Sequence, residues 1–371
     1  MAMIRRYLPI PKDLSQLILW YERYISPLSL LAGFIADNFI LLKRVDVWES
    51  EILLFFYLSL AAIGIVLLNA VESGRVRHLR VLAIAPILPV VAQFAFGGLF
   101  SAFVSLYSRS AAFVGTWIFV AALVVLLLGN ERFRKLYVRF SFQISLYFFA
   151  LFLFLIFFLP VVLHKIGTQM FLLSGLIAIL CISLLLLVLS RVSPEIERRE
   201  RTRSARSIAV IWFVITALYF SNAIPPLPLA LKDAGVYHGV THLSDGTYVM
   251  QGEGHQWYEA FLPVAATYHA LPGEGALVFT SVFAPTGLST QILHVWQWYD
   301  PVSKAWITRN TLSFTISGGR DGGYRGYSRT FNLTPGKWRV NVVLPSGSVI
   351  GRVSFEVITT ESSVELKTTN H

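Results

Sequence analysis

Long apolar runs constrain this 371-residue chain more than any other feature of its sequence. A run of about 18 to 20 mostly apolar residues can cross a bilayer as one α-helix, because a helix satisfies its own backbone hydrogen bonds in hydrocarbon. Seven such runs lie before residue 225, at 25–42, 52–71, 81–106, 111–129, 142–163, 168–190 and 207–224. With 55% hydrophobic and only 14% charged residues, the composition matches neither a soluble globule nor a disordered chain. The sequence therefore predicts a membrane α-helical bundle of about seven transmembrane helices over residues 1–225.

Basic residues in this region are concentrated in alternate loops. If the N-terminus is cytoplasmic, 17 of the 21 Lys and Arg residues lie in inner segments and four lie in outer loops. Membrane proteins keep Lys and Arg on the cytoplasmic side, so this arrangement is the expected one. In an alternative arrangement the run 25–42, which contains Asp37 and Asn38, is an interfacial helix. The C-terminus lies outside the cytoplasm in both arrangements.

The pattern changes after the proline cluster at 225–228, because proline removes a backbone donor and cannot continue a helix. Short alternating runs separated by Gly, Pro, Asn and Asp turn signals follow, as in antiparallel β-structure. These runs lie around 276–283, 291–299, 311–317, 327–333, 337–344 and 348–357. We predict an all-β, Ig-like sandwich domain over 226–358, outside the cytoplasm, followed by a frayed polar tail at 359–371.

Several classes of function are excluded by composition and motifs. The net charge of +10 arises entirely before residue 226, and residues 226–371 hold ten basic and ten acidic residues, which argues against nucleic acid as a partner. Cys181 is the only cysteine, so no intramolecular disulfide or cysteine-based zinc site can form. The chain contains no nucleophile elbow, phosphate-binding loop, zinc-protease helix or dinucleotide fingerprint. We expect no cofactor and no catalytic residues.

The glycine-rich segment 318–329 is the least ordinary stretch of the predicted β domain. Its glycines permit sharp turns, its arginines offer planar paired donors to carboxylate or phosphate, and its tyrosines offer stacking faces. It therefore predicts a binding loop for an anionic lipid, an anionic glycan or an envelope protein. In the alternative interpretation it is a long β-connection whose arginines pair internally, with Asp321 as one partner. The candidate ligand-binding residues are Arg320, Tyr324, Arg325, Tyr327 and Arg329.

Polar residues within or beside the apolar runs form a second group of candidates, because charged and amide side chains are costly in hydrocarbon. The functional interpretation is a polar path or headgroup site near the outer leaflet; the alternative is placement at the membrane interface. The candidates are Asp37, Asn38, Asn69, Gln93 and Arg109. The glycine pair Gly97-Gly98 predicts close helix packing, or else local unwinding that lines a cavity.

Histidines are the remaining candidates for chemistry in the C-terminal half. Five lie in the predicted β domain: His238, His242, His255, His269 and His294. Their spacing predicts hydrogen-bonding roles, because His238 and His242 would share a face only on a helix; a zinc or copper site is the alternative. His294, Trp296 and Trp298 alternate along one run and are expected to share a buried strand face; an exposed platform for carbohydrate is the alternative.

Short motifs in both halves carry a resemblance to a known family. They are Gly33-Phe34-Ile35-Ala36-Asp37, Arg44-Val45-Asp46, Gln93-Phe94, Phe96-Gly97-Gly98-Leu99-Phe100-Ser101, Tyr107-Ser108-Arg109-Ser110, Asn130-Glu131, His294-Val295-Trp296, Gly318-Gly319-Arg320 with Tyr324-Arg325, and Pro335-Gly336-Lys337-Trp338-Arg339-Val340. The chain resembles uncharacterised bacterial inner-membrane proteins that pair a multi-span N-terminal region with a C-terminal periplasmic domain of unknown function. The resemblance implies a multi-pass protein of the bacterial inner (plasma) membrane, and it implies no activity.

Three functions stay open at this point. The first is a non-enzymatic envelope protein whose outer β domain binds an envelope partner or an anionic ligand. The second is a transporter or flippase-like protein that handles an amphiphilic substrate through the polar residues of the first and third runs. The third is a membrane-embedded enzyme. Membrane lipid is an expected partner under each, and the sequence does not determine an oligomeric state.

Overall fold

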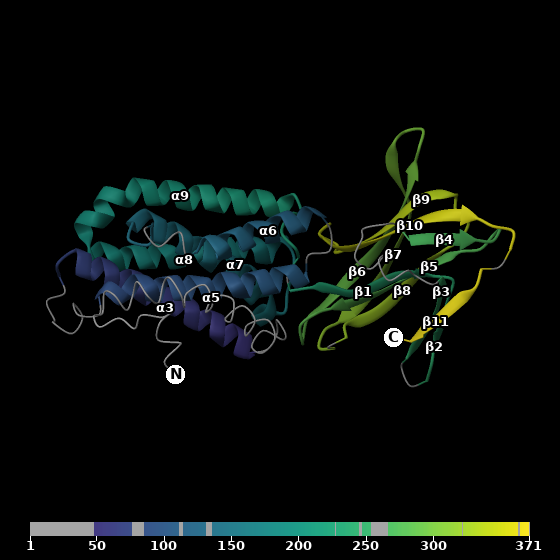
Figure 1. The fold of residues 1–371 in the computed structure, drawn as a ribbon, viewed down its shortest axis with the longest axis horizontal. Coiled ribbons are helices and arrows are strands. Elements are labelled where there is room, and N and C mark those ends of the chain that lie inside the picture. The colour runs from purple at the N-terminus through teal and green to yellow at the C-terminus, as the bar shows by residue number, and fades with distance from the viewer. Residues whose placement is uncertain are drawn as a thin grey trace, which may run out of the picture. The chain divides into compact units, whose positions relative to one another are not determined.

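A computed structural model describes residues 48–75, 85–110, 114–130, 136–226, 228–244, 247–253, 266–320, 322–362 and 364–370. The chain divides into two compact units (Figure 1). The helical unit lies within Met1–Ser108, Ile118–Leu159 and Gln169–Ser221, and the β-rich unit lies within Arg109–Trp117, Pro160–Thr168 and Asn222–His371.

Helices make up the first unit, as the apolar runs predict. They are α3 (Trp48–Glu72), the short 3₁₀ helix η4 (Ala85–Ile87), α5 (Leu88–Arg109), α6 (Val114–Gly129), α7 (Phe140–Leu163), α8 (Thr168–Val192) and α9 (Pro194–Phe220). Among the described residues, α3, α5, α7, α8 and α9 are long and apolar enough to cross a membrane, whereas α6 is shorter. The described residues therefore contain five helices of spanning length, and the predicted number of seven is not confirmed, because α6 is shorter and the run 25–42 lies outside the described residues.

Two helix boundaries differ from the prediction for physical reasons. Within the described residues, the predicted run 81–106 consists of η4 followed by α5, and Pro86 and Pro89 lie at this start because proline suits the first turn of a helix and not its interior. The predicted run 207–224 is the apolar second half of α9, which begins earlier, at Pro194. Proline at the first position and Glu195 in the first turn, where a carboxylate interacts favourably with the helix dipole, begin a helix that apolarity alone does not reveal.

Close packing holds α5 at the centre of the helical unit. Phe96, Phe100 and Phe103 of α5 are all fully buried. The helix runs without interruption through Gly97 and Gly98, so the unwinding alternative is wrong. A Cβ added at Gly98 would lie 2.5 Å from the ring of Tyr57, which explains why only glycine fits at this crossing with α3.

A seam of serines joins the polar half of α9 to α7. The Ser141 hydroxyl donates to a Glu200 carboxylate oxygen at 2.7 Å and lies 3.3 Å from the Ser204 hydroxyl. One turn further along α7, the Ser145 hydroxyl donates to the Ser207 hydroxyl at 2.7 Å. Small polar side chains permit close approach and bond across helices, which explains how a helix with a charged first half packs against an apolar one.

Strands make up the second unit. They are β1 (Ala230–Tyr237), β2 (Gly239–His242), β3 (Tyr248–Glu253), β4 (Ala266–Ala270), β5 (Ala276–Phe283), β6 (Ser289–Asp300), β7 (Ala305–Ser317), β8 (Tyr324–Thr330), β9 (Gly336–Val343), β10 (Val349–Thr359) and β11 (Leu366–Asn370). They form three sheets with the orders β1-β5-β8, β4-β10-β9-β6-β7 and β11-β3-β2. All pairings are antiparallel except that of β10 with β4, which is parallel.

Two of the sheets share a buried core. Val236 and Val278 of the β1-β5-β8 sheet pack in one cluster with Trp296, Trp338 and further residues of the five-stranded sheet. The two sheets therefore face each other, and the expected buried position of Trp296 is confirmed.

The third sheet covers the outer side of β5. Met250 of β3 packs against Leu277 and Phe279, which point away from the first core. All eight residues of β5 are consequently buried, although the sequence was interpreted as a strand with one exposed face. A strand buried on both faces is continuously apolar rather than alternating.

All six predicted strands are present, with shifted ends. The run predicted at 327–333 is β8 at Tyr324–Thr330, because Asn332 has a φ of +54°, which extended strands do not adopt. The short strands β1 to β4 contain Gly, Lys, Asp and His and show little alternation, so the pattern did not indicate them. The tail 359–371 was expected to fray, but β11 pairs antiparallel with β3, because backbone N–H and C=O groups form a ladder whether or not the side chains of the added strand are polar.

Candidate functional site

The glycine-rich segment is held tightly against the rest of the β-rich unit. The Gly318 amide donates to the Leu288 carbonyl at 2.8 Å, and the Gly319 amide donates to the Ala284 carbonyl at 3.0 Å. Gly323 has a φ of +86°, and a Cβ there would lie 2.6 Å from the Ser281 hydroxyl. These glycines therefore permit a close backbone approach, as expected of a structural β-connection; Asp321 lies outside the described residues.

The structure separates the five candidate residues of this segment into two groups. Tyr324 packs against a buried core cluster, and the Arg320 guanidinium lies 5.4 Å from its ring centroid. Arg325, Tyr327 and Arg329 alternate along β8 and share its other face. On that face the Tyr327 side chain is 48% exposed, and the Arg329 guanidinium lies 4.9 Å from the ring of Phe331.

A second pair of arginines lies on the outer face of the five-stranded sheet, and the sequence interpretation did not select it. Trp338, Val340 and Val353 point into the core, so Arg339 of β9 and Arg352 of β10, at alternate positions, point away from it. In the β9–β10 register, Arg352 lies directly opposite Asn341 of β9.

Amide side chains position both guanidinium groups. The Arg339 Nε donates to the Gln297 side-chain oxygen at 2.7 Å, and the Arg352 Nε donates to the Asn341 side-chain oxygen at 2.6 Å. The Asn341 amide in turn donates to the same Gln297 oxygen at 3.0 Å. Because each contact uses only Nε, the two terminal nitrogens of each guanidinium remain available as donors.

The electrostatic environment of this pair is positive. Burial, followed by the charge of Arg352, lowers the pKa of Arg339, and burial lowers the pKa of Arg352. Both groups remain charged at neutral pH because an arginine pKa begins above 12. Across the described ranges, neither arginine forms an ion pair with a carboxylate. The Arg339 guanidinium also lies 4.2 Å from the Trp306 ring centroid, a stacking contact that holds its plane.

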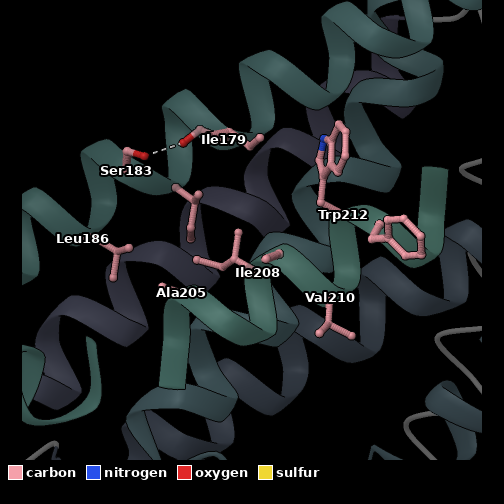
Figure 2. Close-up of a pocket in the computed structure, with 10 residues that line it drawn as sticks. Ile179, Ser183, Leu186, Ala205, Ile208, Val210 and Trp212 are labelled. Carbon is pink, nitrogen blue, oxygen red and sulfur yellow. Dashed lines mark hydrogen bonds between the residues drawn. The ribbon is translucent and has the colours of Figure 1, made fainter. Parts of the chain in front are cut away.

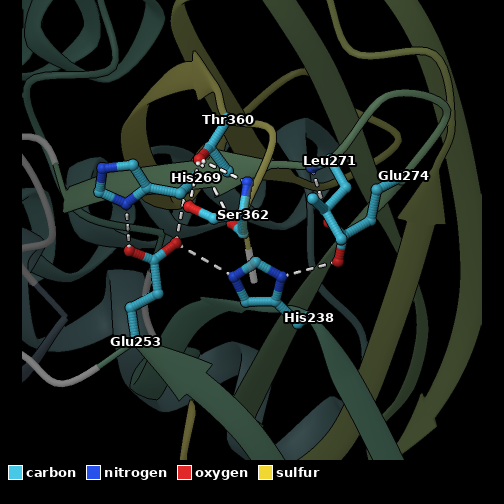
Figure 3. Close-up of polar contacts among 7 residues, drawn as sticks. All are labelled: His238, Glu253, His269, Leu271, Glu274, Thr360 and Ser362. Carbon is cyan, nitrogen blue, oxygen red and sulfur yellow. Dashed lines mark hydrogen bonds and ion pairs between the residues drawn. The ribbon is translucent and has the colours of Figure 1, made fainter. Parts of the chain in front are cut away.

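The histidines form two separate hydrogen-bonded groups. In Figure 3 the His238 ring lies between two carboxylates, with Nδ1 2.7 Å from a Glu274 oxygen and Nε2 3.0 Å from a Glu253 oxygen. Glu253 also accepts from the His269 backbone amide and contacts its ring Nδ1, both at 2.6 Å. Burial would raise the pKa of Glu253, but these hydrogen bonds outweigh it and the pKa is lowered.

His294 belongs to the buried group. Its ring nitrogens lie 3.0 Å from the Thr280 hydroxyl and 2.7 Å from the Ser328 hydroxyl, and Ser328 also accepts from the Trp296 indole at 2.9 Å. Burial lowers the pKa of His294 to about 4, so the ring is neutral at pH 7. In the part of the chain that the structure describes, no group of three or more His, Cys, Asp or Glu side chains could hold a metal ion.

The polar candidates of the helical unit are only partly described. Asp37 and Asn38 lie outside the described residues, and Arg109 ends α5 with its side chain undescribed. Gln93 is buried, and its backbone carbonyl accepts from the Asn130 side chain at 3.0 Å.

Asn69 belongs to another buried contact in the helical unit. Its amide donates to the Gln143 side-chain oxygen at 2.7 Å, which joins α3 to α7. Interhelical hydrogen bonds of this kind hold helices together.

An apolar groove of about 710 Å³ lies between α8 and α9 (Figure 2). Ile179, Leu186 and Ile208 contribute to its lining. Its polar side chains are few, and the Ser183 hydroxyl donates to the Ile179 carbonyl of its own helix at 2.7 Å. The groove therefore offers apolar contact and no reactive group.

Comparison with known proteins gives a family match within the β-rich unit. A family described as "Protein of unknown function (DUF2914)" matches residues 289–357, from the start of β6 to near the end of β10. This region contains both the glycine-rich segment and the Arg339–Arg352 pair. No curated protein matches the chain. A solved structure, "Pseudomonas fluorescens alkylpurine DNA glycosylase AlkC bound to DNA containing an abasic site analog", matches with 12% identity over 92% of this chain and 85% of its own, with a TM-score of 0.18.

Proposed function

We propose that this chain is a multi-pass protein of the bacterial inner membrane whose β-rich unit lies outside the cytoplasm and binds an anionic ligand at Arg339 and Arg352. The observation that carries the proposal is the environment of these two arginines. They lie close together on an exposed sheet face, amide side chains fix their positions, and no described carboxylate neutralises them.

A structural role alone would favour a different environment. Like charges held close together repel, and partly buried charges are normally paired. Here the two guanidinium groups are partly buried, and no described carboxylate pairs with them. The terminal guanidinium nitrogens then offer two planar forks that match carboxylate or phosphate oxygens. The ligand class is therefore a carboxylate- or phosphate-bearing envelope component, such as an anionic glycan, an anionic lipid or an acidic protein segment.

The strand arrangement supports an Ig-like sandwich as the scaffold of this site. In Ig domains the second and fifth strands pair in one sheet, and the third, sixth and seventh strands form the other, with a tryptophan buried on the third. If β5 is taken as the second strand, β8 pairs with it, and β6, β9 and β10 lie together in the facing sheet. Trp296 is the buried tryptophan on β6. The ligand site then lies on the outer face of the sheet opposite β5.

The experiment compares two double variants of the full chain in detergent. Arg339→Gln/Arg352→Gln removes the proposed site, and Arg320→Gln/Arg329→Gln removes the same charge from the glycine-rich segment. Binding is measured with a fluorescent uronic-acid oligosaccharide and with phosphatidylglycerol vesicles, so that carboxylate and phosphate ligands are distinguished. A charge-assisted hydrogen bond contributes roughly 1.5 kcal/mol or more, so the first variant should bind about 100-fold more weakly.

The control variant should bind like the wild type. Equal losses in both variants would show a response to net charge and not to a site. Loss only in Arg320→Gln/Arg329→Gln would transfer the ligand site to the glycine-rich segment and refute this assignment.

A further inference from the structure

A second basic site is present in the helical unit. A cavity of about 750 Å³ lies where three segments meet: the end of α3, the residues that lead into α7, and the first turns of α9. Its charged lining consists of Arg139, Arg199, Arg203, Glu72 and Glu200. Its volume is in the range of small-molecule sites. Among the described lining residues, three arginines against two glutamates leave one net positive charge.

The internal contacts of the cavity leave two of its arginines available. The Glu200 carboxylate accepts from the Ser141 hydroxyl at 2.7 Å and from Arg203 at 3.2 Å. Glu200 is thus already engaged within the protein. Arg139 and Arg199 form no ion pair with any residue in the described ranges. Their guanidinium groups therefore face the cavity with donors free for a ligand.

The arginines of α9 lie on different faces of the helix, and only one face lines the cavity. Arg199 and Arg203 are four residues apart and lie on one face, together with Glu200. Arg198 and Arg201 line no part of the cavity, and Arg201 pairs with Glu197 at 3.6 Å. The helix thus presents two arginine pairs of equal charge, and only one of them lines the cavity.

The position of the cavity indicates its ligand. Glu72 is the last residue of α3 and Arg139 directly precedes α7, and both helices are long and apolar enough to cross a membrane. The ends of spanning helices lie at the depth of lipid headgroups. Val138, Phe140 and Ile196 add apolar lining beside the arginines. A group with a phosphate at one end and hydrocarbon at the other matches this combination.

We propose that this cavity binds the phosphate of an anionic phospholipid, with Arg139 and Arg199 as the main donors. A lipid with one net negative charge balances the wall, whereas a zwitterionic lipid leaves the surplus positive charge uncompensated. Basic pockets between helices on the cytoplasmic side are an established type of headgroup site. The inference rests on the membrane location proposed above, but the site is in a different unit from the Arg339–Arg352 pair, so loss of ligand binding at one site leaves the other untouched.

Native mass spectrometry of the full chain in detergent tests this site. Phosphatidylglycerol, phosphatidylethanolamine and inorganic phosphate are added separately, and the bound fraction of each is measured. Arg199→Gln/Arg203→Gln is compared with Arg198→Gln/Arg201→Gln, which makes the same charge change on the same helix. Each pair also includes one arginine that contacts a glutamate, so the comparison is matched in lost ion pairs.

The cavity variant should bind phosphatidylglycerol about 30-fold more weakly, since each basic side chain contributes roughly a fivefold gain near an anionic lipid. The control should stay within about threefold of the wild type. If the cavity variant fails to fold, Arg139→Gln alone, which removes no ion pair, should weaken binding about fivefold. Equal losses in both double variants, equal binding of phosphatidylethanolamine, or saturation by inorganic phosphate without competition from lipid would each overturn the proposal.

Discussion

Replacement of His238 by leucine should destabilise the β-rich unit more than any substitution of an exposed histidine in the same region. The His238 side chain is 8% exposed and contacts carboxylates at both ring nitrogens, at 2.7 and 3.0 Å. Carboxylates only accept hydrogen bonds, so both contacts are hydrogen bonds when both ring nitrogens carry protons. The ring also stacks on Tyr268 at a centroid distance of 4.2 Å.

The expected loss of unfolding free energy depends on which contacts Glu253 and Glu274 keep after His238 is replaced. Each charge-assisted hydrogen bond contributes about 1.5 to 3 kcal/mol, but Glu274 is partly exposed and can rehydrate, and Glu253 keeps its contacts with His269. We therefore expect a loss of about 3 kcal/mol. The hydrogen bonds that lower the pKa of Glu253 provide stability above the ordinary carboxylate range, and this stability is lost as pH falls through the lowered value. The effect of His238→Leu should accordingly diminish in acid.

Hydrogen exchange of the full chain in detergent, followed by mass spectrometry, measures this effect locally. Peptides from β1, β3 and β5 should exchange on the order of 100-fold faster in His238→Leu, because local opening has become easier. The matched control is His242→Leu, since His242 is exposed on β2 and contacts the Tyr248 ring. If both variants exchange at the same rate, the His238 network does not hold the third sheet in place.

Three further predictions concern burial and topology. Gly98→Leu should lower the melting temperature of the helical unit, because an added Cβ would lie 2.5 Å from the Tyr57 ring and overpacking costs about 1 to 3 kcal/mol. Gly64→Leu is the control in the same thermal assay, because the nearest atom to a Cβ added there is 3.9 Å away. The free energy of unfolding of the wild type should fall by roughly 3 kcal/mol between pH 6.5 and 4, because the unfolded state binds a proton at His294 that the folded state does not. Melting temperatures of His294→Gln measured at pH 7 and 5 should therefore depend less on pH than those of the wild type. An unchanged pH dependence would contradict the assignment. Arg201→Cys and Ser346→Cys, each in a Cys181→Ser background, should react differently with an impermeant thiol reagent on spheroplasts. Only the cysteine at position 346 should be labelled if the C-terminus is outside the cytoplasm, and labelling at position 201 alone would reverse the topology.

The sequence was sufficient to predict a helical region followed by a β-rich region. Apolar runs of 18 or more residues predict helices, because a helix satisfies its own backbone hydrogen bonds in hydrocarbon. The runs from 52–71 onward correspond to helices α3 and α5 to α9. Alternation with period two likewise located β6 to β10, and the buried position of Trp296 followed from it. These are local signals, in which neighbouring residues alone specify the periodicity.

Tertiary structure decided the features that depend on pairing between distant segments. The short strands β2 and β3 carry little periodicity of their own, because the outer face of β5 supplies their apolar partner. The polar half of α9 is part of the bundle through serine contacts with α7 that no spacing within α9 indicates.

The candidate sites show the same division. Alternation along the hairpin 337–357 already placed Arg339 and Arg352 on the polar face, and that signal was available in the sequence. Their proximity, and the use of Gln297 and Asn341 in place of carboxylates, depends on the pairing of β9 with both β6 and β10. Periodicity specifies which face a side chain occupies, whereas the register between strands determines which charges meet on that face.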